Sequence, residues 1–290
     1  MRQVKVWVLG ARPKTLFAAL SPIITAIFYT VYLDKFSWYL ASLALLVAIS
    51  LQVGVNYAND YSDGIRGTDE DRVGPIRLVG QKLASAKQVR FAAFFSFFVA
   101  AIAGLIIAIT IDELWLLLVG ISAIFSAWFY TGGKKPYGYA GFGEIFVFIY
   151  FGLVATMGTV YLQTKELTLV SFVLGSIMGS FAVVILLANN LRDAEKDSLV
   201  DKRTLAVQLG DRPTRILIVL LMVKPFLNLL FLMYLLDPQV WPAFLAIVWL
   251  LQPIRIIVRG AKGKELIPVL VKTGQAQLLF SLLLLLSLLF

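Results

Sequence analysis

Nine predominantly apolar stretches of 18 to 21 residues run through the chain and restrict its possible folds more than any other feature. A helix needs roughly 20 residues to cross about 30 Å of hydrocarbon. Open β-strands are excluded because lipid would leave their backbone polar groups unpaired. The prediction is an all-α integral membrane protein, a bundle of nine transmembrane helices in one polytopic domain over residues 1–290. The stretches are Leu16–Leu33, Phe36–Val55, Phe91–Ile111, Leu114–Thr131, Ile145–Leu162, Leu167–Leu187, Ile216–Leu236, Val240–Ile257 and Thr273–Phe290.

Composition supports a membrane protein, since 60% of the residues are hydrophobic and only 15% are charged. A soluble domain has about 45–50% apolar and about 25% charged residues. The first stretch follows basic residues, as a signal peptide does, but Ser21-Pro22 interrupts it and another stretch follows at once. We therefore interpret it as a retained helix. Small residues in the sixth stretch predict close helix packing. These residues are Gly175, Ser176, Gly179 and Ser180.

The positive charges predict the orientation of the chain in the membrane. Of 26 Lys and Arg residues, 23 lie in the N-terminal segment and in alternate loops, whereas the other loops contain only Lys35 and Lys165. Cytoplasmic loops carry the excess of positive charge. We therefore expect a cytoplasmic N-terminus, cytoplasmic loops at 56–90 and 188–215, and a C-terminus outside. The net charge of +9 is then mainly an orientation signal, so binding to nucleic acid is not expected. Lys224 lies inside a stretch, facing either the bundle interior or a membrane interface.

The chain has neither histidine nor cysteine, which restricts the available chemistry. Disulfides, thiol nucleophiles, zinc sites built from Cys and His, and Ser-His or Cys-His triads are all excluded. Catalysis by this chain must use carboxylates, amides, hydroxyls, Lys and Arg, with a hard metal ion as a further option.

Two acidic motifs lie at matching positions, four stretches apart, which predicts two four-helix repeats plus one helix. A spacing of four residues puts Asn59 and Asp63 on one helical face, and it does the same for Asp193, Asp197 and Asp201. Because stacked carboxylates repel, we expect a cationic group beside them. One such motif alone is typical of a solvated helix face. Two on the same side of the membrane favour Mg²⁺, which takes oxygen ligands together with substrate phosphates.

Basic residues interleave with these acids and suggest a phosphate-bearing substrate. Arg binds phosphate through forked hydrogen bonds and Lys binds it as a point charge. The alternative is that each one only marks the cytoplasmic face. The candidates are Arg12, Lys14, Arg66, Arg72, Arg77, Arg192, Lys196, Lys202 and Arg203.

A diphosphate site that opens into an apolar bundle suits a lipid diphosphate. If its chain is allylic, metal and basic residues stabilise the departing diphosphate, and aromatic faces stabilise the carbocation left behind. Aromatic residues near the cytoplasmic ends of the stretches could provide such faces, although aromatics also gather at membrane interfaces without that role. They are Tyr57, Tyr61, Trp128, Tyr130, Tyr137, Tyr139, Phe146, Phe148 and Tyr150.

Four blocks of sequence resemble the UbiA-type intramembrane aromatic prenyltransferases, most closely the members that act on 1,4-dihydroxy-2-naphthoate. The blocks are ARPKTL at 11–16, NYANDYSDGIRGTDEDRVGPIR at 56–77, KPYGYAGFGE at 135–144 and NNLRD at 189–193. The resemblance implies a UbiA-like fold and catalytic residues Asn59, Asp63, Asp193 and Asp197. These four and Asp60 would be the Mg²⁺ ligands. Lys135 and Glu144 depart from the commoner Arg and Asp of the family but keep the charge.

The reaction implied by the resemblance transfers a polyprenyl group from polyprenyl diphosphate to dihydroxynaphthoate, with loss of carbon dioxide and diphosphate, giving demethylmenaquinol. The acceptor is an anion, so we expect a second cationic patch at Lys134 and Lys135 beside Tyr137 and Tyr139, with Arg12 and Lys14 as alternatives. Glu144 would orient the acceptor or a lysine, or else favour a helix N-terminus. The expected partners are these substrates and the lipid bilayer, without an obligatory protein partner. The remaining substrate-binding candidates are Asn56, Asn189 and Asn190.

Three alternatives remain open from the sequence. The first is another aromatic acceptor, such as 4-hydroxybenzoate, because the acidic motifs do not select the ring. The second is a CDP-alcohol phosphatidyltransferase, whose acids would all lie in one compact run, which this chain lacks. The third is a secondary transporter, which would place ionisable groups near the middle of the membrane.

Overall fold

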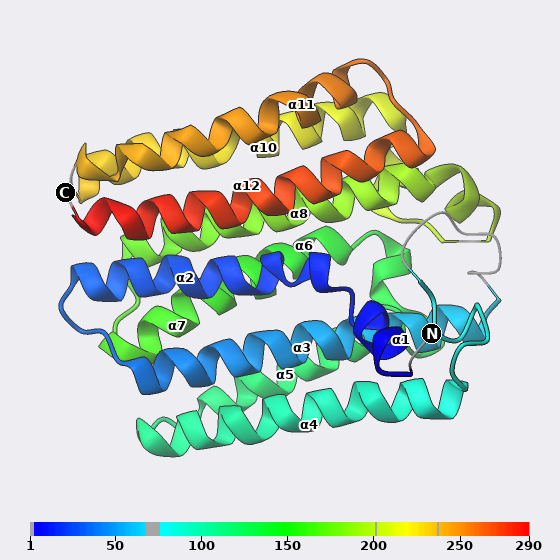
Figure 1. Ribbon diagram of the computed structural model, residues 1–290, viewed down its shortest axis with the longest axis horizontal. Coiled ribbons are helices and arrows are strands. Elements are labelled where there is room, and N and C mark those ends of the chain that lie inside the picture. Colours follow the sequence, from blue (N-terminus) through cyan, green and yellow to red (C-terminus); the bar gives the residue numbers. More distant parts are fainter. Residues whose placement is uncertain (1–2, 68–75, 201, 237, 290) are drawn as a thin grey trace. The chain divides into compact units, whose positions relative to one another are not determined.

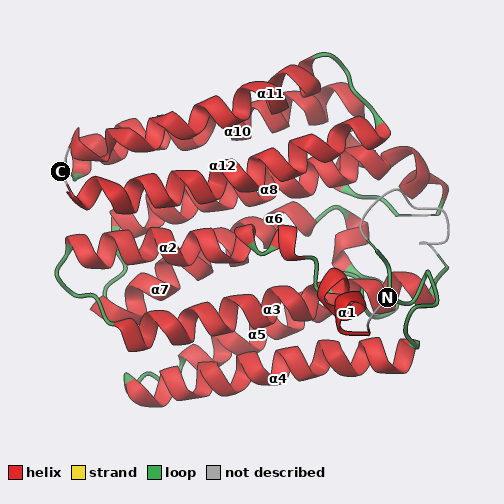
Figure 2. Cartoon of the chain, in the orientation of Figure 1, coloured by secondary structure: helices red, strands yellow, loops and turns green. Residues whose placement is uncertain are grey.

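The computed structural model describes residues 3–67, 76–200, 202–236 and 238–289, and this part of the chain is helical without any strand (Figure 2). The chain divides into two compact units. Unit 1 comprises residues 1–16 and 43–140, and unit 2 comprises residues 17–42 and 141–290.

Unit 1 is built on three helices joined by a buried apolar cluster. Phe97, in the helix Ala86–Thr110, lies in this cluster against Gly54 of the helix Trp38–Ile65. A Cβ added to Gly54 would lie 2.4 Å from the Phe97 ring. Ala127, in the helix Leu116–Phe129, packs into the same cluster. The elements of unit 1 are α1 (Gln3–Gly10), η1 (Pro13–Thr15), most of α3 (Trp38–Ile65), α4 (Ala86–Thr110), α5 (Leu116–Phe129) and η2 (Tyr137–Ala140) (Figure 1).

Unit 2 is arranged around α8 (Leu169–Leu199), its longest and most buried helix. A capping box begins α8: Ser171 N donates to Thr168 Oγ1, and Thr168 N donates to Ser171 Oγ. The other elements are α2 (Phe17–Tyr32), α6 (Gly143–Val147), the π-helix η3 (Phe148–Val154), α7 (Ala155–Thr164), α9 (Leu205–Leu209), α10 (Asp211–Leu235), η4 (Pro238–Ala246), α11 (Ile247–Val258), η5 (Gly263–Leu266), α12 (Ile267–Leu286) and η6 (Ser287–Leu289).

The close packing predicted from small residues occurs where η3 crosses α8. A Cβ added to Gly152 would lie 2.5 Å from Gly179 Cα and 2.7 Å from the carbonyl oxygen of Gly175. Because both obstacles are backbone atoms, this crossing has no room for a side chain on Gly152. The glycines thus allow the π-helix and α8 to approach each other directly.

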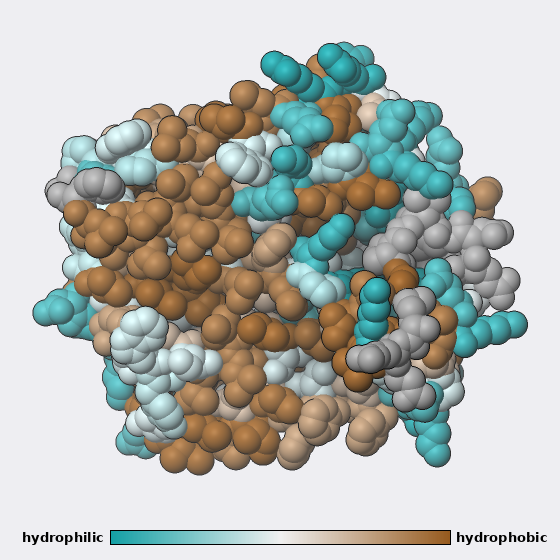
Figure 3. Space-filling view, in the orientation of Figure 1, coloured by the Kyte–Doolittle hydropathy of each residue, from teal (hydrophilic) through white to brown (hydrophobic). Residues whose placement is uncertain are grey.

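Seven helices of the described chain are long and apolar enough to span a membrane, or eight if the bent pair Val4–Thr15 and Phe17–Tyr32 forms one span. The predicted count of nine is therefore not confirmed, because the stretch at 114–131 forms a helix of only 14 residues, α5. Apolar side chains cover most of the visible surface over α2 and over the C-terminal half of α12 in unit 2, as expected for helices in lipid (Figure 3). The protein is a multi-pass membrane protein.

The segments 56–90 and 188–215, expected as loops, begin with helical residues. Residues 56–65 form the last turns of α3, and residues 188–199 form the last three turns of α8. The acidic motifs therefore lie on helices that continue beyond the apolar stretches, which gives their side chains defined positions.

Candidate active site

The first acidic motif lies on one face of the last turns of α3. The Thr131 hydroxyl donates to Asn59 Oδ1 at 2.8 Å, and the Tyr139 hydroxyl donates to Asp63 Oδ1 at 2.7 Å. Both partners come from the segment that follows α5. The predicted pairing of Asn59 and Asp63 on one face is thus seen directly, and the sequence did not indicate Thr131.

Two arginines and Tyr139 complete this cluster in unit 1. Arg77 Nη2 lies 3.8 Å from Asp63 Oδ2, and both side chains are buried. Arg66 donates to the carbonyl oxygens of Thr131 and Gly133, and its guanidinium lies 5.3 Å from the centre of the Tyr139 ring. Burial, and then the negative charge of Asp63, raise the pKa of the Tyr139 phenol well above its ordinary value. Tyr139 therefore remains a hydrogen-bond donor to Asp63.

Asp60 has a different environment from its neighbours. Its side chain is fully buried, and its two oxygens accept hydrogen bonds from the backbone N–H groups of Leu78 at 2.7 Å and Val79 at 3.0 Å. These bonds fix the segment that carries Arg77. Both oxygens of its carboxylate are thus directed at backbone donors, which gives Asp60 a structural contact that its neighbours lack, and its role as a Mg²⁺ ligand stays a prediction.

Asn56 holds the N-terminal segment against α3. Its amide nitrogen donates to the Ala11 carbonyl and to the Thr15 hydroxyl, both at 2.9 Å, and Gln52 donates to the same hydroxyl at 3.1 Å. The two bonded residues, Ala11 and Thr15, come directly before Arg12 and directly after Lys14 in the chain. Asn56 therefore positions the segment that carries two substrate-binding candidates, and Gln52 is a contributor that the sequence did not single out.

The second acidic motif lies near the end of α8 in unit 2, with a basic partner for each acid. Arg192 makes a forked contact with Asp193, at 2.8 and 2.6 Å, and also reaches Asn189 Oδ1 at 2.8 Å. Lys202 Nζ lies 3.2 Å from Asp197 Oδ2. Both aspartates are buried. The expected cations beside the stacked carboxylates are confirmed, whereas Asp201 lies outside the described residues.

Glu144 and Asn190 form a buried polar pair that joins α6 to α8. Asn190 Nδ2 donates to Glu144 Oε1 at 2.9 Å, while Glu144 Oε2 has no hydrogen-bond partner within the described chain. A buried oxygen without a donor is costly, so a bound hydroxyl or water would stabilise it.

The remaining candidates divide into anchored and exposed side chains. The Tyr137 hydroxyl donates to the Ser126 carbonyl at 2.8 Å, which ties η2 to α5. Lys14, Lys134, Lys135 and Lys196 are exposed. Arg72 lies outside the described residues.

The donor atoms suit a hard cation that also binds substrate. The described residues contain no cluster of three or more acidic metal ligands. Each unit instead offers a pair of oxygen-bearing side chains one turn apart, Asn59 with Asp63 and Asp193 with Asp197. Mg²⁺ usually binds through one or two carboxylates and completes its coordination with phosphate and water. The residues therefore fit Mg²⁺ in the presence of a diphosphate.

Comparison with known proteins identifies the class. The sequence model of the UbiA prenyltransferase family matches residues 19–267. A 1,4-dihydroxy-2-naphthoate octaprenyltransferase from Mycobacterium tuberculosis is 47% identical over 277 residues, covering 95% of this chain and 94% of that protein. The chain belongs to the UbiA prenyltransferase family, as its motifs predicted. This membership decides against the phosphatidyltransferase and transporter alternatives.

Solved structures show the same fold. A UbiA homologue from Archaeoglobus fulgidus bound to GPP and Mg²⁺ is similar with a TM-score of 0.67 and 14% identity, covering 97% of this chain and 99% of that one. The apo UbiA homologue from Aeropyrum pernix K1 is similar with a TM-score of 0.69 and 10% identity, covering 100% and 98%. The all-helical UbiA fold predicted from the sequence is confirmed.

Proposed function

We propose that this protein transfers a polyprenyl group from polyprenyl diphosphate to 1,4-dihydroxy-2-naphthoate, with release of diphosphate and carbon dioxide, giving demethylmenaquinol. The observation that carries the proposal is the 47% identity, over 95% of the chain, to a relative with that acceptor in its name. The C–O bond to diphosphate breaks, and a C–C bond forms at the ring carbon that bears the carboxylate. Carbon dioxide then leaves, and its bonding electrons restore the aromatic ring.

The leaving diphosphate is the group that the chain must stabilise. Asn59 and Asp63 in unit 1 would hold one Mg²⁺, and Asp193 and Asp197 in unit 2 would hold the other. When bound, the metal supplies Lewis-acid stabilisation of the diphosphate oxygens. Arg77 in unit 1 would donate hydrogen bonds to phosphate, with Arg72 as a further candidate. Arg192 and Lys202 in unit 2 would do the same, and the exposed Lys196 is a further phosphate-binding candidate there. Arg77, Arg192 and Lys202 each lie within 4 Å of a carboxylate of these motifs, so each would be close to a diphosphate bound there.

The carbocation and the acceptor place further demands on the site. Tyr61 and Trp128 stack in unit 1 with ring centres 6.0 Å apart and would offer aromatic faces to the cation. The exposed Lys134 and Lys135 would attract the acceptor carboxylate, with Arg12 and Lys14 as alternatives. Glu144 Oε2 would accept a hydrogen bond from an acceptor hydroxyl.

We further infer a membrane arrangement from the charges. Nine spans, with α5 as a short one, would place the N-terminus and both acidic motifs on the cytoplasmic side and the C-terminus outside. This arrangement follows from the distribution of Lys and Arg among the loops. It would give the water-soluble acceptor and the cofactor Mg²⁺ access to the site from the cytoplasm.

The test is an acceptor competition in washed membranes that contain the protein, Mg²⁺ and farnesyl diphosphate. We expect mass spectrometry to detect prenylated naphthoquinol when dihydroxynaphthoate and 4-hydroxybenzoate are supplied together. Prenylated 4-hydroxybenzoate as the main product would assign the other acceptor. Absence of any prenylated product, in membranes where an active relative does form it, would overturn the proposal.

A further inference from the structure

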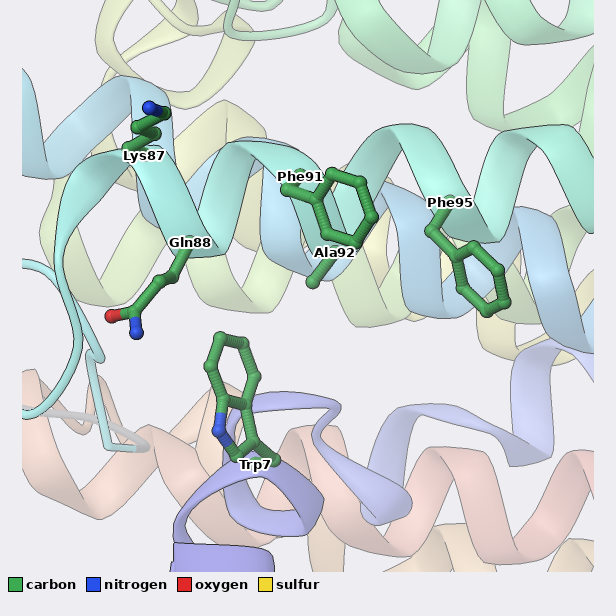
Figure 4. A pocket seen from close by; sticks show the side chains of 6 residues that line it. All are labelled: Trp7, Lys87, Gln88, Phe91, Ala92 and Phe95. Carbon is green, nitrogen blue, oxygen red and sulfur yellow. The ribbon is translucent and has the colours of Figure 1, made fainter.

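A groove in unit 1 lies between α1 and α4 and is separate from the acidic motif. Its volume is about 460 Å³, within the range typical of ligand sites. Trp7 projects from α1 towards α4, whose side chains form the opposite wall (Figure 4). The lining residues are Trp7, Lys87, Gln88, Phe91, Ala92 and Phe95.

The walls of this groove are anchored by other parts of unit 1. The Tyr57 hydroxyl donates to the Trp7 carbonyl at 2.9 Å, and the two rings meet edge to face with centres 5.7 Å apart. On the other wall, Gln88 belongs to the capping box of α4, since its Oε1 accepts from the backbone N–H of Ser85 at 3.0 Å. Lys87 is the charged residue among those that line the groove. It lies in the first turn of α4, and its ammonium group extends from the side of α4 away from Trp7 (Figure 4).

The groove is lined by apolar side chains along its length and has a basic residue at one end. Phe91 and Phe95 are one turn apart on α4 and are 71% and 57% exposed, which is a large apolar surface for two neighbouring rings. Lys87 lies one turn before Phe91, so the charge is at one end of the aromatic row (Figure 4). Such a surface matches a molecule with an apolar chain and a charged head.

The charged residues near the basic end favour a negatively charged head. Besides Lys87, Lys5 is exposed on α1, Lys82 in the turn before α4, and Arg90 on α4, where its guanidinium lies 5.9 Å from the centre of the Tyr61 ring. The described acids of unit 1 lie elsewhere. Asp60 and Asp63 are buried on α3, and Asp112 and Glu113 follow the opposite end of α4.

We propose that this groove is a binding site for an anionic glycerophospholipid. One acyl chain would lie along Phe91 and Phe95 against Trp7, and the phosphate would pair with Lys87. The position suits a lipid, because α4 is a membrane-spanning helix and Lys87 is in its first turn. Basic residues at the membrane surface attract anionic headgroups, and interfacial Trp suits the boundary between headgroup and chain. The site goes beyond the proposed function and does not depend on it.

The experiment measures quenching of Trp7 fluorescence in phosphatidylcholine nanodiscs that contain phosphatidylglycerol with brominated acyl chains. The difference between the wild-type protein and Trp7→Phe isolates the signal of Trp7 from that of the other tryptophans. We expect saturable quenching at a low fraction of phosphatidylglycerol. Lys87→Gln should weaken it about fivefold, the effect of about 1 kcal/mol for one basic residue near an anionic surface. Phe95→Ala should also weaken it.

Matched controls come from the same chain. Lys264→Gln removes another exposed lysine, and Phe98→Ala removes another exposed ring of α4 that does not line the groove, so both should leave the titration unchanged. Equal quenching by brominated phosphatidylcholine, or an unchanged curve for Lys87→Gln, would overturn the proposal. Displacement of the brominated lipid by stoichiometric farnesyl diphosphate would assign the groove to the prenyl substrate and would also overturn it. Because the readout is binding, its failure is independent of prenyl transfer.

Discussion

The hydroxyl of Tyr139 donates a 2.7 Å hydrogen bond to Asp63 Oδ1, which connects η2 to the last turn of α3. Seventy-six positions separate the two residues in the chain. The bond joins the acidic motif to the segment KPYGYAGFGE. It also orients a buried carboxylate that we propose as a Mg²⁺ ligand, so the phenol is a positioning group for that ligand.

Tyr139→Phe should lower kcat/KM by roughly 10-fold to 100-fold, because a hydrogen bond to a charged group contributes about 1.5–3 kcal/mol. The Mg²⁺ concentration for half-maximal rate should rise as well. Initial rates across a Mg²⁺ titration measure both effects. Tyr137→Phe is the matched control, since its hydroxyl bonds to the Ser126 carbonyl. A Tyr139→Phe enzyme with the Mg²⁺ dependence of Tyr137→Phe would contradict the positioning role.

Asp193→Asn should reduce turnover by about 10²-fold or more, as expected when an electrostatic group that stabilises the leaving diphosphate is removed. The amide keeps the shape but loses the charge that holds metal and Arg192. Glu195→Gln is the control, since Glu195 is on the same helix and pairs with Lys262 at the surface. Single-turnover rates with saturating Mg²⁺ make the comparison. Full activity of Asp193→Asn would exclude Asp193 as a metal ligand.

Asp60→Asn should mainly lower stability, by about 1–3 kcal/mol, since one of the two backbone N–H groups of Leu78 and Val79 would face an amide donor. Thermal unfolding of the detergent-solubilised protein measures this change. The Mg²⁺ dependence of the folded enzyme should stay close to that of the wild type. A large rise in the Mg²⁺ requirement at unchanged stability would instead support Asp60 as a Mg²⁺ ligand.

Gly152→Ala should destabilise unit 2 severely, because its new Cβ would lie 2.5 Å from Gly179 Cα, and backbone cannot move aside easily. Gly158→Ala is the control in the adjacent helix α7, where a Cβ meets nothing within 4 Å. That change should be neutral or stabilising by about 0.5–1 kcal/mol. Expression level and the midpoint of thermal unfolding report both effects. Equal midpoints for the two variants would show that the crossing of η3 and α8 tolerates a methyl group.

Lys224→Met should leave prenyl transfer largely intact. Lys224 Nζ donates to the hydroxyls of Ser176 and Ser180 and lies 5.1 Å from the centre of the Phe148 ring, so it faces the interior of unit 2. No carboxylate within the described chain pairs with it. An apolar side chain of similar length removes the cost of burying an ammonium group and loses two hydrogen bonds, effects that largely offset. A large loss of kcat at unchanged stability would give Lys224 a functional role.

The site was partly predictable from the sequence. The pairing of Asn59 with Asp63, and the cations beside Asp193 and Asp197, follow from helical spacing and from the repulsion of like charges, which are local properties. The roles of Asp60 and Asn56 were not predictable, because adjacent polar residues look alike in a sequence. Their hydrogen bonds to Leu78 and Ala11 exist only after distant segments pack together.

The sequence alone determined that the chain is helical, resides in a membrane and belongs to its family, because apolar length, charge distribution and short motifs are all written along the chain. Tertiary structure decided which carboxylate faces a tyrosine and which faces backbone donors. It also decided that the stretch around α5 is a short helix, and that Trp7 and Phe91 line one groove. The physical reason is that these outcomes depend on contacts between segments far apart in the chain.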